Sequence, residues 1–353
     1  MTAEQTDAPA ADEAATAIDG AADGTGPGDG GGTAGGDLLG RLRRSGLADY
    51  GIVWVTLILF LLLWQTSDVF LTSANLRNIV DQQSLIVIAG SAMTLTLISG
   101  NFDISLSAIF INASIGTALL FNETESALVA IGGGIALGAV CGLVNGLVVA
   151  LVGINSFIAT LSTSFVFYGI GFLLSERSII RITDRDFSQI ARGRDLGITN
   201  ASIVAVVVVI VFWFVLERTR YGRHLFAAGG NPEAARLAGI QVERVVISSF
   251  VLTGIAAGLA GALLASRTLT AQPSDDFSFV FSVLTAVIIG GTSIAGGEGA
   301  VWRTVLGAFF IALLTNGFNI HQIDPIIQRL VQGSVILLAV AADNWTRNRA
   351  STT

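Results

Sequence analysis

The stretch Tyr221–Ile240, YGRHLFAAGGNPEAARLAGI, is polar and lies between two apolar blocks that each look able to cross a membrane. Asn231 is a good N-cap because its side-chain oxygen accepts a hydrogen bond from the first helical turn. Pro232 then falls at the first helical position, where its missing N–H costs nothing. Glu233 suits the positive end of the helix dipole, and Gly239 is typical of the residue after a helix. The stretch predicts a helix of about two turns.

Small residues surround this predicted helix and favour close approach by another backbone. Gly229 and Gly230 are expected to let the chain turn before the cap. The helix is either a plain interfacial link between two spans or a docking helix that receives force from a cytosolic partner. The residues expected to form the docking surface are Gly229, Gly230, Asn231, Pro232, Glu233, Ala234, Ala235, Arg236 and Gly239.

The segment GRHLFAAGGNPEAARLAGI resembles the cytoplasmic coupling segment of ribose-type ABC importer permeases, in the branched-chain and sugar permease superfamily. In that family this segment seats in a groove of the ATP-hydrolysing subunit. The resemblance implies that cytosolic ATPase subunits dock at Gly229–Gly239, and it covers about residues 50–342.

The composition of the whole chain is that of a membrane protein. Of 353 residues, 52% are hydrophobic and 13% are charged, with a mean hydropathy of +0.72. Soluble proteins carry about a quarter charged residues. Residues 1–40 contain eight acids and no base, which leaves 18 acids against 19 Arg in the rest of the chain. Because apolar residues are scarce in this tail, we expect it to be disordered and cytoplasmic.

The basic residues and the single cysteine exclude several classes of chemistry. The chain contains no Lys, so it has no P-loop for ATP and no Lys for Schiff-base catalysis. Cys141 is the only cysteine, and His224 and His321 are far apart, so neither a metal site nor another cofactor is expected. We therefore expect a transport subunit and not an enzyme.

Ten apolar segments approach the length of a membrane span and predict an all-α polytopic protein. They lie at 50–66, 79–99, 103–121, 127–152, 155–174, 199–216, 244–266, 278–295, 300–318 and 327–342. The membrane domain is expected over 41–345, followed by a short cytoplasmic tail at 346–353.

Arginine placement predicts which side of the membrane each loop occupies. Arg41, Arg43 and Arg44 precede the first span and hold the N-terminus in the cytoplasm. An even number of spans returns the C-terminus to the same side and puts the docking helix there too. The loop 175–200 would then lie outside although it contains five Arg. Its Arg181 and Arg185 either dock an extracytoplasmic binding protein or belong to a solvated loop with local ion pairs.

Residues 99–108, SGNFDISLSA, place Asp103 between two apolar runs. An ionisable group at membrane depth is costly and is a functional candidate. Gly100 and Asn101 indicate a broken helix that faces a cavity, as in many substrate sites. The stretch is similar to TGGIDLSVGS of the ribose-type permeases and keeps Gly100, Asp103 and Ser105. Asp103 either lines the substrate pathway together with Asn101 and Ser105, or caps the next helix.

Two further stretches are similar to the same family. In 138–161, Gly138, Gly142 and Gly146 share one helix face and permit close packing. Asn145 on this helix should find an interhelical partner, for packing or for contact with a sugar. The third stretch, GGTSIAGGEG at 290–299, predicts a tight turn into the ninth span, which could also help to seat the ATPase.

The resemblance implies the permease subunit of an ABC importer in the bacterial plasma membrane that moves a ribose- or xylose-like monosaccharide inwards. A second copy or a paralogue, two ATPase subunits and an extracytoplasmic binding protein are the expected partners, with no nucleic acid. The alternatives are the same machinery for a nucleoside, an amino acid or a signalling molecule, and an ion-coupled secondary carrier. A carrier would need intramembrane carboxylates or His arranged as a relay.

Overall fold

The computed structural model describes residues 51–194 and 197–350. The predicted tail at 1–40, the three Arg that follow it, and the end of the predicted C-terminal tail lie outside the described residues.

The described chain is almost entirely helical. The long helices are α2 (Gly51–Thr66), α3 (Ser73–Ile98), α4 (Leu106–Thr124), α5 (Ala127–Leu147), α6 (Ser156–Leu174), α8 (Asn200–Arg218), α11 (Val242–Thr268), α12 (Ser278–Ile289), α13 (Val301–Ile320) and α14 (Pro325–Ala350). Shorter elements are the π-helix η1 (Val148–Val152), the 3₁₀ turn η2 (Asp186–Ser188), α7 (Gln189–Arg192), α9 (Arg220–Gly230) and α10 (Pro232–Leu237). Strands β1 (Ile180–Arg181) and β2 (Thr270–Ala271) pair antiparallel, with Ile180 opposite Ala271.

The all-α polytopic fold predicted from the sequence is confirmed. Among the described residues, six helices are long and apolar enough to cross a membrane: α4, α5 with η1, α6, α8, α11 and α13. Helices α2 and α12 are apolar but shorter. Each predicted span coincides with one long helix, although the count of ten spans stays a prediction. The eighth predicted span, 278–295, is too long, because α12 ends at Ile289 where a glycine-rich loop begins.

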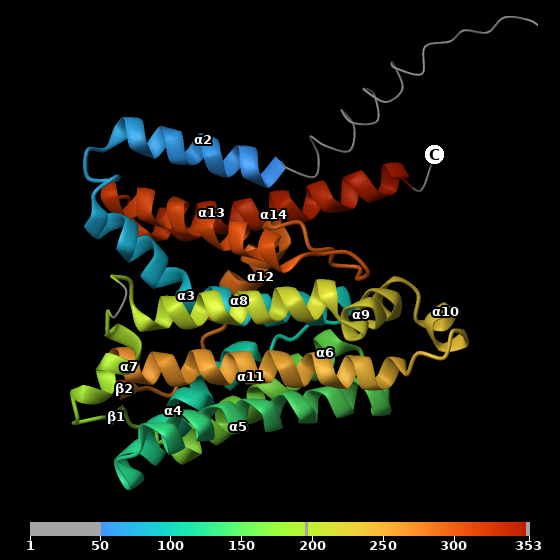
Figure 1. Ribbon diagram of the computed structural model, residues 1–353, viewed down its shortest axis with the longest axis horizontal. Helices are drawn as coiled ribbons and strands as arrows, with labels where there is room; N and C mark the ends of the chain where they lie inside the picture. The colour runs from blue at the N-terminus through green and yellow to red at the C-terminus, as the bar shows by residue number, and fades with distance from the viewer. Residues whose placement is uncertain (1–50, 195–196, 351–353) are drawn as a thin grey trace, which may run out of the picture. The chain divides into compact units, whose positions relative to one another are not determined.

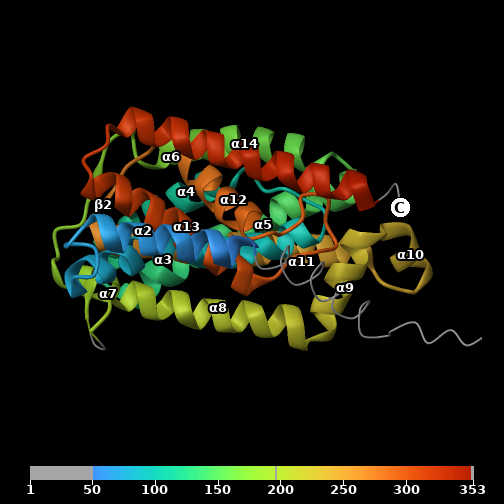
Figure 2. The same ribbon diagram turned by 90° about the horizontal axis from the view of Figure 1, so that it is seen from above.

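Helices α9 and α10 lie at one end of the long helices, and α7 lies with β1 and β2 at the other end (Figures 1 and 2). The predicted docking helix and the loop 175–200 are therefore at opposite ends of the helical bundle, as the alternation of spans requires.

Helices α5 and α11 pack with almost no side chain between them. A Cβ atom at Gly138 would collide with the carbonyl oxygen of Gly254, and one at Gly142 with the carbonyl oxygen of Phe250. At Gly146 a Cβ would lie 2.8 Å from Cα of Ile247. The predicted role of these three glycines in close packing is confirmed, and it follows from their common helix face.

This packing predicts a difference between two glycines of the same helix. Gly142→Ala should destabilise the protein by about 1–3 kcal/mol, because the two backbones must separate. Gly132→Ala is the matched control, since no atom lies within 4 Å of its Cβ position. Thermal unfolding in detergent measures both variants. Equal melting temperatures for the two would show that the α5–α11 contact is not tight.

Candidate functional site

The short helix predicted after Asn231 forms as α10. Asn231 is extended, with φ −155° and ψ 96°, and its Oδ1 accepts a hydrogen bond from the N–H of Ala234 at 3.0 Å. Pro232 is the first residue of α10, and Gly239 follows the helix at φ +83°. Arg236 forms ion pairs with Glu233 at 3.4 Å and with Glu243 of α11 at 3.0 Å. These contacts brace α10 against the start of α11.

Helix α10 is exposed on most of its surface. Ala235 is its buried residue, whereas Leu237 is 91% exposed and the Glu233 side chain is 85% exposed. The sequence analysis did not single out Leu237. The residue type did not predict this exposure, because a leucine in a short helix is ordinarily buried.

The prediction that Gly229 and Gly230 form a turn is wrong, because both are the last residues of α9 and the chain breaks at Asn231. The small size of Gly229 and Gly297 allows close approach, whereas the Cβ position of Gly230 is open. A Cβ at Gly229 would collide with the carbonyl oxygen of Ile98. A Cβ at Gly297 would lie 2.9 Å from Cα of Gly230.

Three segments far apart in the sequence therefore meet through their backbones. The N–H of Gly297 donates to the carbonyl oxygen of Ile98 at 2.9 Å. A Cβ on Gly296 would lie 2.7 Å from Cα of Gly100 and 3.0 Å from the carbonyl oxygen of Gly229. We call Gly100, Gly229, Gly230, Gly296 and Gly297 the glycine junction.

The glycine junction also depends on left-handed backbone. Gly100, Gly296 and Gly297 have φ of +79°, +85° and +76°, a region that costs a residue with Cβ roughly 1–2 kcal/mol. The loop 290–299 is thus a turn that needs positive φ, as predicted, and it also holds the end of α9 against the end of α3.

The break between α3 and α4 spans residues 99–105 and includes Gly100. Two of its backbone N–H groups are bonded by side chains of α6. The N–H of Phe102 donates to Oγ of Ser156 at 3.0 Å, and the N–H of Ile104 donates to Oγ1 of Thr160 at 3.0 Å. Asn101 stands apart, with its Nδ2 bonded to the carbonyl oxygen of Ser99 at 3.0 Å.

Asp103, Ser105 and Asn145 come together in one buried chain of hydrogen bonds. Thr163 donates to Oδ1 of Asn145 at 2.7 Å, and Nδ2 of Asn145 donates to Oγ of Ser105 at 2.6 Å. The Ser105 hydroxyl donates to Oδ1 of Asp103 at 2.6 Å, and so does its N–H at 3.0 Å. Asn145 has therefore found the interhelical partner that the sequence predicted.

Asp103 precedes α4, and its Oδ1 bonds Ser105, the residue before the first turn, so the backbone of that turn receives no side-chain cap and both roles predicted for Asp103 stay predictions. Its Oδ2 atom accepts no hydrogen bond from the described residues, although the side chain is fully buried. A buried carboxylate oxygen without a partner is costly. This oxygen is therefore free to accept a hydrogen bond from a further group.

Arg181 and Arg185 are both exposed at the end opposite α10. The loop that carries them is fixed to the helices. Phe187 packs on Phe121 of α4 with ring centroids 4.1 Å apart, and its carbonyl oxygen accepts from Oγ of Ser266 at 2.7 Å. Neither Arg forms an ion pair within the described parts of the chain. Nor do those parts bring together three His, Cys, Asp or Glu side chains that could hold a metal ion.

Comparison with known proteins gives consistent matches over this architecture. Residues 75–340 match the model of the family described as branched-chain amino acid transport system / permease component. The L-arabinose ABC transporter permease protein AraH of Azospirillum brasilense is 33% identical over 299 residues, covering 85% of this chain and 88% of that protein.

Two Escherichia coli (strain K12) proteins are similar to a comparable extent. The ribose import permease protein RbsC is 34% identical over 82% of this chain and 91% of its own length. The D-allose transport system permease protein AlsC is 32% identical over 83% of this chain and 91% of its own length. No solved structure matches.

The packing at the glycine junction predicts that alanine substitutions at two adjacent glycines affect stability differently. Gly229→Ala should destabilise the protein by about 1–3 kcal/mol, because its Cβ would displace the carbonyl of Ile98. Gly230→Ala should be tolerated, since nothing lies within 4 Å of its Cβ position. Thermal unfolding of the purified variants measures the difference, and a Gly230→Ala variant as unstable as Gly229→Ala would contradict the described packing.

Proposed function

Because the chain belongs to the family of branched-chain amino acid transport system permease components, we propose that it is the membrane subunit of an ATP-driven importer for a monosaccharide. The observation that carries this proposal is α10, an ordered and exposed helix that is joined to the transmembrane helices through the glycine junction. A separate ATPase would dock on α10, since a chain without Lys has no P-loop of its own.

The relatives favour a sugar among the possible solutes. Arabinose, ribose and allose permeases each share about a third of their residues with this chain over most of its length. Their agreement on pentoses and a hexose favours a monosaccharide over the amino acid in the family description. A nucleoside or a signalling molecule would use the same machinery and is distinguished by the uptake assay below.

An ion-coupled carrier is the alternative of another class. It would need a relay of titratable side chains across the membrane. Asp81 and Asp103 are the buried acids of the described residues, and each is bonded to neighbouring hydroxyls and not to the other. An exposed docking helix would also have no purpose in a carrier.

We infer that the break at 99–105 moves when the ATPase acts. It lies between the glycine junction and the buried chain of Asp103, Ser105 and Asn145. Asn101, Asp103 and Ser105 would line the pathway with Asn145 in the open arrangement, where the free Oδ2 of Asp103 would gain a partner. The protein would then exist in two arrangements, the described one and an open one. ATP binding would shift their relative populations, and uptake would depend on that shift.

The remaining partners follow from the architecture of such importers. A second copy or a paralogue would complete the pathway, and an extracytoplasmic binding protein would deliver the sugar at the end that carries Arg181 and Arg185. In such an assembly both termini and α10 would lie on the cytoplasmic side of a bacterial plasma membrane.

Uptake of labelled sugar tests the proposal. Cells that lack the chromosomal gene for this chain are complemented with the native chain and given labelled L-arabinose, D-ribose, D-allose or L-leucine. Restored uptake of one of the three sugars is expected, and it should stop when the partner ATPase is removed. Uptake that survives removal of the ATPase would favour the carrier, and uptake of leucine alone would overturn the sugar assignment.

The docking role of α10 predicts loss of ATPase association on charge reversal. Glu233→Arg and Leu237→Asp should each weaken co-purification of the ATPase subunit by about tenfold or more, because interface anchors are worth about 2 kcal/mol or more. Glu123→Arg is the control, since it is the same reversal at the exposed opposite end. If both α10 variants bind the ATPase as well as the native chain does, α10 is not part of the interface.

Reversal of Arg181 and Arg185 should weaken association with the binding protein and reduce uptake, while ATPase binding is retained. Arg223→Glu, on α9 at the other end, is the control for added negative charge. If the variant with both charges reversed binds the binding protein normally, the loop is a solvated surface and not a docking site.

A further inference from the structure

A groove of about 430 Å³ lies between α9 and the first half of α11. Five residues on one face of α11 form its longer wall: Arg244, Ile247, Ser248, Val251 and Leu252. They share this face because they are spaced three and four residues apart. Tyr221 of α9 forms the other side, and its hydroxyl lies 3.1 Å from Oγ of Ser248. The groove therefore has one cationic side chain and otherwise mainly apolar walls.

The length of α11 indicates how deep this groove lies in a membrane. The 27 residues of α11 extend about 40 Å, whereas the hydrocarbon layer is about 30 Å thick. Arg244 is the third residue of α11, at the end of the bundle that carries α10 (Figure 1). It therefore lies at the depth of the lipid headgroups. Val251 and Leu252 lie about 10–12 Å further along the helix, within the hydrocarbon layer.

The charge of Arg244 is available to a ligand. Between residues 217 and 244 the chain contains five Arg and three Glu. Two of the three, Glu233 and Glu243, both pair with Arg236. Arg244 is exposed and takes part in none of the ion pairs that the described residues form. It also stands in the first turn of α11, where the helix dipole favours a bound anion.

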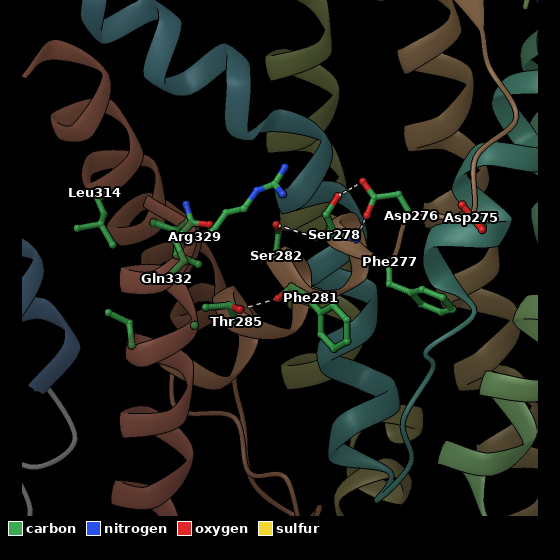
Figure 3. A pocket seen from close by; sticks show the side chains of 13 residues that line it. Asp275, Asp276, Phe277, Ser278, Phe281, Ser282, Thr285, Leu314, Arg329 and Gln332 are labelled. Carbon is green, nitrogen blue, oxygen red and sulfur yellow. Dashed lines mark hydrogen bonds between the residues drawn. The ribbon is translucent and has the colours of Figure 1, made fainter. Parts of the chain in front are cut away.

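The larger cavity between α12 and α14, of about 790 Å³, has a different charge balance. Asp275 and Asp276 line it together with Arg329 (Figure 3). Because two carboxylates accompany one guanidinium, this lining does not favour an anion. Among the described residues that line the groove beside α9, Arg244 is the charged one. Of these two hollows, the groove is therefore the one suited to an anionic ligand.

We propose that the groove binds one anionic phospholipid from the leaflet at the α10 end of the bundle. The guanidinium of Arg244 would pair with the phosphate, a charge-assisted contact that Arg makes well. One acyl chain would lie along Ile247, Val251 and Leu252. The site is independent of which solute the protein imports, so it goes beyond the proposed function.

A lipid fits this groove better than a soluble protein partner does. The apolar wall continues to the depth of the hydrocarbon layer, which a soluble protein does not enter. Helix η1, which packs on α11 at the same end, also exposes Leu151 and Val152. Apolar side chains exposed beside the groove suit contact with acyl chains. A bound lipid would contact both α11 and α9, the helix that ends in the glycine junction.

Native mass spectrometry of the purified full chain tests the lipid site. The chain is stripped of lipid in a neutral detergent and titrated with dioleoyl phosphatidylglycerol or dioleoyl phosphatidylcholine. These lipids have the same acyl chains and differ in net charge. Arg244→Gln removes the cation of the groove. Arg223→Gln is the matched control, because Arg223 is exposed on α9 at the same end and lies outside the groove.

For the first lipid bound, we expect the native chain and Arg223→Gln to favour phosphatidylglycerol by about tenfold, because a hydrogen bond between charged groups contributes about this factor. Arg244→Gln should bind the two lipids equally. Its melting temperature should match that of the native chain, because the side chain is exposed. Equal affinity of the native chain for the two lipids would overturn the proposal. So would a preference for phosphatidylglycerol that survives in Arg244→Gln.

Two competitors test for other occupants. If inorganic phosphate displaces the first phosphatidylglycerol, the groove is a site for a free anion. If the purified ATPase subunit displaces it, the groove belongs to a protein interface. Either displacement would overturn the lipid site. None of these results depends on uptake by the native chain, so failure of the lipid site would leave the import function standing.

Discussion

Contact between backbones without intervening side chains is the constraint on which this structure depends. Packed helices ordinarily keep their axes about 8–10 Å apart, because side chains fill the space between them. At the glycine junction the carbonyl of Ile98 occupies the space that a Cβ of Gly229 would need, and Gly297 donates to the same carbonyl. Any displacement of α9 and α10 must therefore move the end of α3 and the break that follows it. The same device joins α5 to α11, so Asn145 is carried on a rigid helix pair.

Under the proposed function, these two contacts would connect a cytosolic partner to the interior. The exposed helix α10 would take the force, and the glycine junction would pass it to residues 99–105. That segment is held in place by the hydroxyls of Ser156 and Thr160 and by the chain from Thr163 to Asp103. Side-chain hydrogen bonds of this kind are worth about 1 kcal/mol each, so the break can be rearranged while the glycine-packed helices stay intact.

Much of the fold was predictable because the signals are local. Apolar runs marked the long helices, and Asn231 with Pro232 marked the start of α10. The features that the sequence did not predict depend on contacts between segments that are far apart in the chain. Gly229 and Gly230 look like turn residues until Ile98 and Gly297 are placed beside them. The exposure of Leu237, the partnership of Ser105 with Asn145 and the cavity beside α12 likewise arise from residues distant in sequence. The predicted eighth span ended too late because it ran six residues past Ile289, into the stretch 290–299 that the sequence itself predicts to turn.

The central claim is that the glycine junction couples the ATPase to the break between α3 and α4. Its most direct measurement is the number of ATP molecules hydrolysed per sugar imported, in proteoliposomes that contain the native importer or the Gly296→Ala variant. If the claim is right, the variant still assembles with its ATPase and hydrolyses ATP, but the ratio rises steeply because import fails. A variant that assembles and keeps the native ratio would contradict the claim.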